Sequence, residues 1–422
     1  MKLTRLSLVA IATLFCNSLG VANATPLEEA IKNVDVSGYA RYRYTNNNID
    51  DKGNKSTSAD HRLKFVIDFK AAIDDNFFGV VGLLYDTRDD SGSKNAATDK
   101  SYTENSFSLK KIYLGYSIGN TTITAGRQNI GTYFESILSG VGIKIINKDI
   151  KNITLIAAAF DALDKFDSGV NGGSNRATTQ YDGALLPYLQ NKHGISGNFY
   201  TIGVMGNFNP VIFKAWYANF KDVGELYAAD MALNFDINNI KLDLQGQYVH
   251  NEADYYEFNN ADFYAFKAGV DAFGLKVNAG YLNFEVDDSE NGKVGKSFLT
   301  IEGNGKLINS TKILNSAMSA GSGATNKGES HYYNTIKGEN EFWFINAKYT
   351  FNKFSIGAGY TDGEGYSYQL ARKADRSEWY GQFDYKYSKK LNLTAWYASA
   401  KDEKDYKEVK HDRFRFEAKY TF

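Results

Sequence analysis

Alternation of apolar and polar residues recurs along almost the whole chain and limits it to β structure. Residues 34–44, VDVSGYARYRY, place Val, Ala and Tyr on one face of an extended strand and Asp, Ser and Arg on the other. Residues 411–422 carry the same pattern to the final Phe422. The composition agrees, because 30 Tyr and 28 Phe favour pleated strands and only 3 Pro interrupt them.

The pattern predicts eighteen strands joined by short and long connections that mostly alternate. The predicted strands are 34–44, 61–72, 77–88, 107–118, 121–127, 141–147, 152–163, 197–206, 210–219, 225–236, 240–250, 261–272, 275–285, 340–351, 354–362, 376–387, 391–402 and 411–422. The longer connections are 45–60, 89–106, 128–140, 164–196, 251–260, 286–339, 363–375 and 403–410. An even strand count with this alternation predicts an all-β fold, a closed transmembrane antiparallel β-barrel of about 18 strands with short periplasmic turns and long extracellular loops. The connection 286–339 has room for one more hairpin.

Alternation alone does not say which face of the strands points inward. A soluble sandwich would bury the apolar face, but a sandwich of this length should divide into domains, and no linker interrupts the hairpin pattern. A barrel of eighteen strands leaves an aqueous lumen in which charges stay hydrated while apolar side chains face lipid. The sequence therefore predicts an apolar outer face. The aromatics expected in the interfacial girdles are Tyr42, Tyr44, Trp343, Tyr349, Trp379, Tyr385, Tyr387, Trp396, Tyr397 and Tyr420.

The first 24 residues form a separate segment. Two cations, an apolar stretch from Leu6 to Phe15 and the small-residue pattern Ala22-Asn23-Ala24 predict a signal peptide at 1–24 and a mature barrel domain at 25–422. The apolar stretch is too short for a membrane-spanning helix, which needs about 20 residues. The mature chain would have no cysteine and a charge of 46 minus 49, or -3, so charge alone does not suggest nucleic acid as a partner.

Four stretches carry a resemblance to a known family. They are TPLEEAIKNVDVSGYARYRY at 25–44, TAGRQNIGT at 124–132, DYKYSKKLN at 384–392 and the closing AKYTF. With them the chain resembles the major outer membrane porin family of Campylobacter and related epsilonproteobacteria. The resemblance implies a homotrimer of eighteen-stranded barrels, general diffusion of small hydrophilic solutes, a preference for cations and a structural calcium ion near the constriction.

Five cationic residues are candidates for a selectivity filter in the lumen. Arg41, Arg43, Arg62 and Lys64 cluster on the expected lumen faces of adjacent strands, and Arg127 lies at an expected strand end. A charged constriction decides which hydrated ions and solutes pass, so these residues predict a basic wall. The alternative is a set of solvated lumen charges without selectivity, because lumen faces are generally polar.

The calcium ligands are candidates by resemblance alone. The matching positions are Glu135, Asp161 and Glu302, which are far apart in sequence. Calcium takes about six to eight oxygen ligands, so closure of the barrel and inward folding of loops would have to bring these carboxylates together. Solvated loop carboxylates are the competing interpretation.

The last residues are candidates for an assembly signal. By resemblance to other outer-membrane barrels, Tyr420 and Phe422 would be recognised by the barrel-insertion machinery. The alternative interpretation is that both rings merely face lipid.

These observations predict a passive, water-filled channel in the cell outer membrane for ions and small hydrophilic solutes, with long loops and lumen charges forming the constriction. The string G-x-S-x-G occurs at 115–119, GYSIG, but it lies at an expected turn between two strands and not at the strand-to-helix elbow of a hydrolase. No close His and carboxylate metal spacing supports an enzyme either. The alternative function is a surface adhesin barrel with little conduction, whose long loops would bind host surface ligands.

Overall fold

The described part of the chain consists mainly of β-strands. The computed structural model describes residues 34–51, 53–89, 107–133, 139–163, 198–256, 258–289, 294–297, 307–308, 310–314, 336–367, 370 and 372–422. Within these ranges, no helix is both long enough and apolar enough to span a membrane. The predicted signal peptide at 1–24 lies outside the described residues and stays a prediction.

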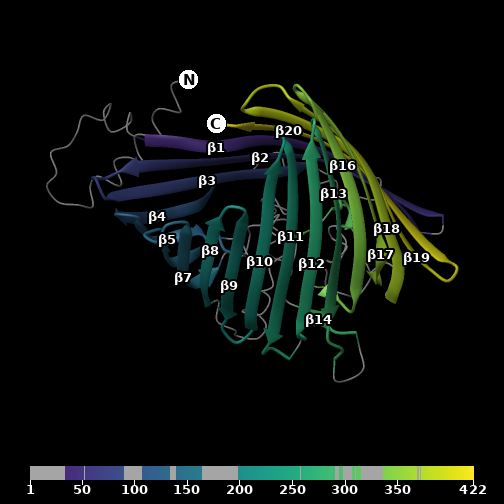
Figure 1. Ribbon diagram of the computed structural model, residues 1–422, viewed down its shortest axis with the longest axis horizontal. Helices are drawn as coiled ribbons and strands as arrows, with labels where there is room; N and C mark the ends of the chain where they lie inside the picture. The colour runs from purple at the N-terminus through teal and green to yellow at the C-terminus, as the bar shows by residue number, and fades with distance from the viewer. Residues whose placement is uncertain are drawn as a thin grey trace.

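Eighteen strands of the described residues form one closed antiparallel sheet (Figure 1). They are β1 (Val34–Asp51), β2 (Asn54–Ala72), β3 (Phe77–Asp89), β4 (Ser108–Ile118), β5 (Thr121–Asn129), β6 (Ser139–Asn147), β7 (Ile153–Leu163), β8 (Phe199–Phe208), β9 (Val211–Phe220), β10 (Gly224–Ile237), β11 (Ile240–Ala253), β12 (Ala261–Ala272), β13 (Leu275–Val286), β16 (Asn340–Phe351), β17 (Phe354–Ser367), β18 (Arg372–Lys386), β19 (Leu391–Lys404) and β20 (Lys407–Thr421). Because β1 pairs with both β2 and β20, the sheet has no open edge. The predicted fold class is confirmed.

A short two-stranded ladder lies in the connection between β13 and β16. It consists of β14 (Lys296–Ser297) and β15 (Ile336–Lys337), which pair with each other and not with the barrel sheet. The connection therefore contains two further strands, but they come from its two ends and do not follow each other as a hairpin.

The two ends of the barrel differ in their connections. We call the end with turns such as 73–76 and 352–353 the short-turn rim, and the opposite end the loop rim. At the loop rim the strands are longer than predicted, since β1 and β2 continue through most of 45–60 and β19 and β20 through most of 403–410. These extensions are mostly polar, with Ile49 and the buried Val409 as exceptions, so alternation is lost while backbone pairing continues.

At the short-turn rim, the turns are built from residues that suit them. Asn238 and Asn239 both have positive φ angles of 53° and 68°, which a two-residue hairpin turn matched to strand twist requires. In the turn before β3, the Asp74 carboxylate accepts hydrogen bonds from the backbone N–H groups of Asn76 (2.8 Å) and Phe77 (2.6 Å). Both bonds lower the pKa of the Asp74 carboxyl, and the bond from Phe77 has the larger effect.

The end of the chain closes the barrel against its first strand. The backbone N–H of Phe422 donates to the Gly38 carbonyl, and the N–H of Gly38 donates to the Phe422 carbonyl, both at 3.1 Å. The Phe422 ring stacks on Phe65 with centroids 5.7 Å apart. A Cβ at Gly38 would lie 2.1 Å from the Val66 carbonyl oxygen, so this close approach requires glycine. The last strand is thus paired on both sides, with β19 and β1.

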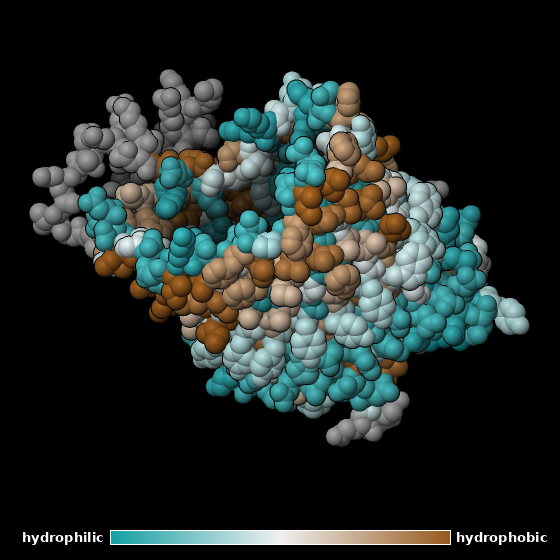
Figure 2. Space-filling view, in the orientation of Figure 1, coloured by the Kyte–Doolittle hydropathy of each residue, from teal (hydrophilic) through white to brown (hydrophobic). Residues whose placement is uncertain are grey.

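The outer surface carries an apolar band with an aromatic border. Large apolar side chains such as Ile143, Ile202 and Phe266 are more than half exposed there, which suits lipid and not water. Aromatic rings pair across neighbouring strands, as in Trp343 with Tyr360 (5.4 Å) and Trp379 with Tyr397 (5.5 Å). Figure 2 shows hydrophobic residues across the outside, then paler residues and a hydrophilic edge toward the end where Figure 1 labels β14. This distribution places the apolar face outward, as the sequence predicts.

Candidate functional site

Four cationic residues of β1 and β2 form one patch on the lumen side. Register places Arg41 opposite Lys64 and Arg43 opposite Arg62, on the face away from the exposed Tyr42. We call these four residues the basic wall. Their adjacency agrees with the sequence, while their role in selectivity stays a prediction.

Two carboxylates from neighbouring strands pair with the basic wall. Asp86 of β3 accepts from Arg62 through both oxygens at 2.7 and 2.8 Å, and lies 3.5 Å from the Lys64 Nζ. Glu417 of β20 lies 2.7 Å from Arg43. The four cations and these two carboxylates give a local charge of four minus two, or +2. Neither acid is predicted from the sequence, because only the register shows that they share a face with these cations.

The structure places Arg127 on the opposite face from the basic wall. Its Cα partners on β4 and β6 are Ile112 and Val141, which are both exposed on the apolar outer surface. The sequence treated Arg127 as the end of a strand, but β5 continues to Asn129, so this residue keeps its place in the alternation. The lumen assignment of Arg127 is therefore corrected.

The described part of the structure does not bring the three calcium candidates together. Glu135 and Glu302 lie outside them. Asp161 is exposed near the loop end of β7, where the register shifts so that it has no Cα partner on β6. Within the described ranges, no group of three or more His, Cys, Asp or Glu residues is arranged to hold a metal ion. The calcium site stays a prediction from the resemblance.

Residues 307–308 and 310–314 fold into the barrel, and we call them the lumen segment. The Glu378 carboxylate on β18 accepts hydrogen bonds from the backbone N–H groups of Lys312 (2.5 Å), Ile313 (2.8 Å) and Leu314 (2.6 Å), and Glu378 is only 2% exposed. On β11, the Gln247 side chain accepts from the backbone N–H of Ile308 at 2.7 Å. Strands β12, β13, β16 and β17 lie between these two anchors, so the segment is held from two separate parts of the wall.

The lumen segment covers an apolar part of the inner wall. Ile308, Ile313 and Leu314 are buried in one cluster with inward residues of the strands, including Phe342 and Phe344 of β16. The sequence assigned apolar side chains to the outer face and did not predict this inner patch. Trp396, predicted for the girdle, is likewise 8% exposed and shares a face with inward Arg415, whose guanidinium lies 5.1 Å from its ring. Its girdle assignment is corrected, because inward residues next to folded segments are shielded from water and can be apolar.

A second segment enters the lumen after β5. Ile130 is fully buried and Tyr133 is 4% exposed. The Lys144 Nζ on β6 donates to the carbonyls of Asn129 (3.0 Å) and Ile130 (3.3 Å), which fixes the start of this segment. Burial, and then the carboxylate of Asp230 on β10, raise the pKa of the Tyr133 phenol, so its neutral form is stabilised.

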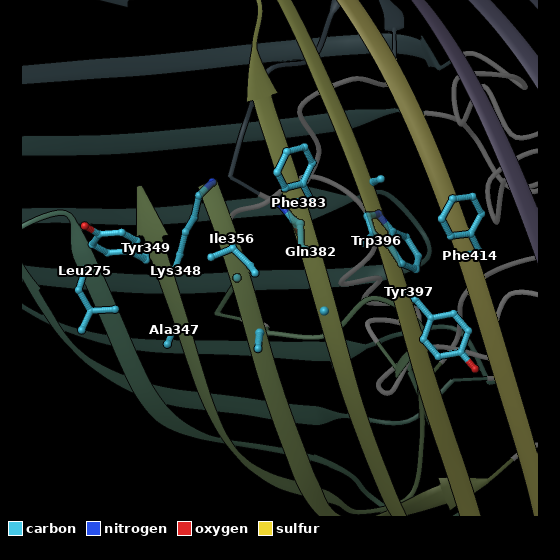
Figure 3. Close-up of a pocket in the computed structure, with 14 residues that line it drawn as sticks. Leu275, Ala347, Lys348, Tyr349, Ile356, Gln382, Phe383, Trp396, Tyr397 and Phe414 are labelled. Carbon is cyan, nitrogen blue, oxygen red and sulfur yellow. The ribbon is translucent and has the colours of Figure 1, made fainter. Parts of the chain in front are cut away.

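Two cavities lie on opposite sides of the barrel wall. One, of about 400 Å³, lies in the lumen between the lumen segment and strands β11, β12, β13, β16 and β18. The other, of about 650 Å³, is an apolar hollow in the outer surface across β13 and β16–β20, where Tyr349, Ile356 and Phe383 border small residues (Figure 3). Its apolar border lies within the lipid-facing band, whereas the 400 Å³ cavity, which we call the lumen cavity, lies inside the barrel on the path of a solute.

Comparison with known proteins gives one family match over the whole chain. A family model described as Campylobacter major outer membrane protein matches residues 1–422. No curated protein matches the chain.

Solved barrels resemble the chain at low sequence identity. Pseudomonas aeruginosa OpdQ is 12% identical, with a TM-score of 0.65 over 93% of this chain and 99% of that one. Pseudomonas aeruginosa OccK7 (OpdD) is 13% identical, with a TM-score of 0.64 over 92% and 98%. Acinetobacter baumannii OccAB4 is 11% identical, with a TM-score of 0.62 over 92% and 98%. At these identities the likeness supports the barrel fold alone.

Proposed function

Because the chain belongs to the Campylobacter major outer membrane protein family, we propose that it is a porin, a passive water-filled channel for ions and small hydrophilic solutes. The protein is located in the outer membrane, and its barrel is closed, with an apolar band outside and charged groups inside. A barrel of eighteen strands is wide enough for an aqueous channel unless inward segments narrow it.

The lumen segment is the single observation that carries this proposal. This segment is bound to the inner wall at Glu378 and at Gln247. It occupies space inside the closed barrel and therefore narrows the lumen. Such a segment makes a constriction, and the charged side chains around it would filter what passes. The segment at 130–133 adds to the narrowing from another part of the wall.

Purified protein in planar lipid bilayers tests the channel. We expect stepwise increases in current of uniform size, as water-filled pores insert one after another. A bilayer that stays silent although insertion is verified would refute the proposal.

The resemblance and the charges described in the lumen predict preference for ions of opposite charge. The resemblance implies a preference for cations, whereas the basic wall has a local charge of +2. The reversal potential in a KCl gradient decides between them. A cation-selective sign supports the implied preference, and an anion-selective sign assigns the filter to the basic wall.

A homotrimer and a structural calcium ion are further proposals from the resemblance. Asp161 is the one calcium candidate among the residues that the structure describes. Light scattering of the detergent-solubilised protein gives the number of subunits. A calcium ion that matters for structure should lower the melting temperature when a chelator removes it, and an unchanged melting temperature would contradict it.

Adhesion is a second candidate function, favoured by exposed tyrosines at the loop rim. Tyr406, at the tip between β19 and β20, is fully exposed, and Tyr256, between β11 and β12, is 77% exposed. Tyrosine offers a large rigid contact area, which suits protein recognition. If this rim binds host surfaces, Tyr406→Ala should reduce attachment of whole cells to epithelial cells while conductance is unchanged.

A further inference from the structure

We propose that the lumen cavity is a binding site for a small organic carboxylate in transit, an inference that rests on the proposed channel function and names a solute class for it. The cavity measures about 400 Å³, within the range of small-molecule sites in proteins. It lies against the lumen segment, so its occupant would be held at the constriction.

The lining of the cavity favours an anion. Three lysines line it, Lys267 from β12, Lys276 from β13 and Lys312 from the lumen segment, and no carboxylate side chain is among the described lining residues. The amide side chains of Gln245 and Asn346 add polar groups. Ammonium groups form charge-assisted hydrogen bonds with a carboxylate, which are stronger than those between neutral groups.

The nearby carboxylates leave part of this positive charge uncompensated. Asp243 lies outside the lining and is shared by Lys267 (3.3 Å) and Lys276 (3.7 Å). Glu378 and Asp384 both attract Lys312 electrostatically, but the Glu378 oxygens accept the three backbone N–H bonds of the lumen segment, and Asp384 pairs with Lys348 at 2.8 Å. With Lys348 included, four cations against three carboxylates leave a local charge of +1.

Lys312 presents its charge at the cavity through neutral partners. Its Nζ donates to the Gln382 side chain at 2.6 Å and lies 4.6 Å from the centre of the Tyr380 ring. Both contacts orient the ammonium group without neutralising it. Because Lys312 belongs to the anchored lumen segment, its position is fixed by Glu378 and not by a flexible loop end.

The apolar part of the lining favours an organic anion over an inorganic one. Leu307, Ile308 and Phe344 line the same cavity as the lysines. An aliphatic group on the carboxylate would contact these side chains and displace water from them, whereas phosphate would leave them without a partner. The geometry therefore fits a short aliphatic carboxylate.

Calorimetry of the purified full-length protein in detergent tests the site without requiring conduction. The probes are sodium propionate, sodium phosphate and methylammonium chloride at equal ionic strength. We expect saturable binding of propionate, weaker binding of phosphate and none of methylammonium. Lys312→Gln should weaken propionate binding about tenfold, since it removes one charged hydrogen bond.

Matched variants make the result specific. Lys148→Gln, exposed at the short-turn rim, should leave propionate binding unchanged. If Lys312→Gln does not fold, Lys267→Gln provides the same comparison from the barrel wall, and Lys312→Arg should retain binding. The inference is overturned if propionate shows no saturable binding, if phosphate binds as tightly, or if Lys148→Gln weakens binding equally.

Failure of this site is distinguishable from failure of the channel. Normal stepwise conductance without propionate binding would refute the binding site alone. Propionate binding with a silent bilayer would refute the proposed channel alone.

Discussion

Two regions of the inner wall have opposite chemistry although both belong to one sheet. On β1 and β2 the inward side chains include the four cations of the basic wall, which pair with Asp86 of β3 and Glu417 of β20. On β10–β13 and β16 a buried apolar cluster that includes Phe263 and Phe344 lies under the lumen segment. The difference shows that the polarity of an inward residue depends on whether water reaches it. The lumen segment covers its part of the wall and excludes water there, so apolar residues can face inward.

The largest effect is expected from breaking the basic wall at its most buried carboxylate. Asp86 is 5% exposed and holds Arg62 through two hydrogen bonds, so Asp86→Ala leaves buried cations unpaired. Removing one partner of a buried pair costs about 3–5 kcal/mol in the free energy of unfolding. Chemical unfolding in micelles measures this loss. Asp68→Ala is the control: it removes the ion-pair partner of Lys111, and Asp68 is more exposed than Asp86. Its loss in the free energy of unfolding should be smaller.

A somewhat smaller effect is expected from releasing the apolar region. Glu378→Ala removes the acceptor of three backbone N–H groups, and each donor left buried would cost about 1–3 kcal/mol. Water satisfies all three donors once the segment detaches, so the loss in the free energy of unfolding stays below that of Asp86→Ala. We therefore expect the lumen segment to detach and single-channel conductance to rise. Glu378→Gln, which keeps an acceptor oxygen, should change conductance less. Equal conductance in wild type and Glu378→Ala would show that this anchor does not hold the constriction.

A third change tests the closure on which both regions depend. Deleting Phe422 removes two backbone hydrogen bonds to Gly38 and the ring contact with Phe65, together about 2 kcal/mol. We expect less assembled protein in the outer membrane while export is unchanged, as measured by fractionation. The control, Tyr420→Phe, keeps the ring and the backbone pairing and should assemble normally. Normal assembly of the deletion would contradict an assembly signal at the terminus.

The smallest effect is expected at the short-turn rim, which neither region contacts. Because the folded-state pKa of Asp74 is depressed, its stabilisation is present above the unfolded pKa and is lost as the pH falls through the folded pKa. The melting temperatures of wild type and Asp74→Ala should therefore differ slightly at neutral pH and converge in acid. A difference that persists at the lowest pH would show that the carboxylate charge is not its source.

Much of the fold was predictable because strand alternation is a local property. Each of the eighteen predicted strands corresponds to a strand of the barrel, and the pairing of the last strand with the first followed from the even count. The polar extensions at the loop rim were not predictable from alternation, because residues such as Asn47 and Ser58 continue the ladder outside the apolar band.

The site was predictable only in part. Alternation placed Arg41 and Lys64 on one face, but the pairing of Asp86 with Arg62 depends on the register between β2 and β3. Arg127 was misplaced because the end of β5 was set too early. Glu378, the main anchor, gives no local signal, since its partners are backbone groups 64 to 66 residues away in the sequence.

The sequence by itself determined the strands, the apolar outer face and the meeting of the two chain ends, because these follow from a period of two and an even strand count. Only the tertiary structure decided which charges meet and which inner surface is dry. Trp396 and Phe344 can be apolar although they face inward, because folded segments and neighbouring side chains shield them from water. Such cover comes from residues distant in the chain, so its effect is absent from any local pattern.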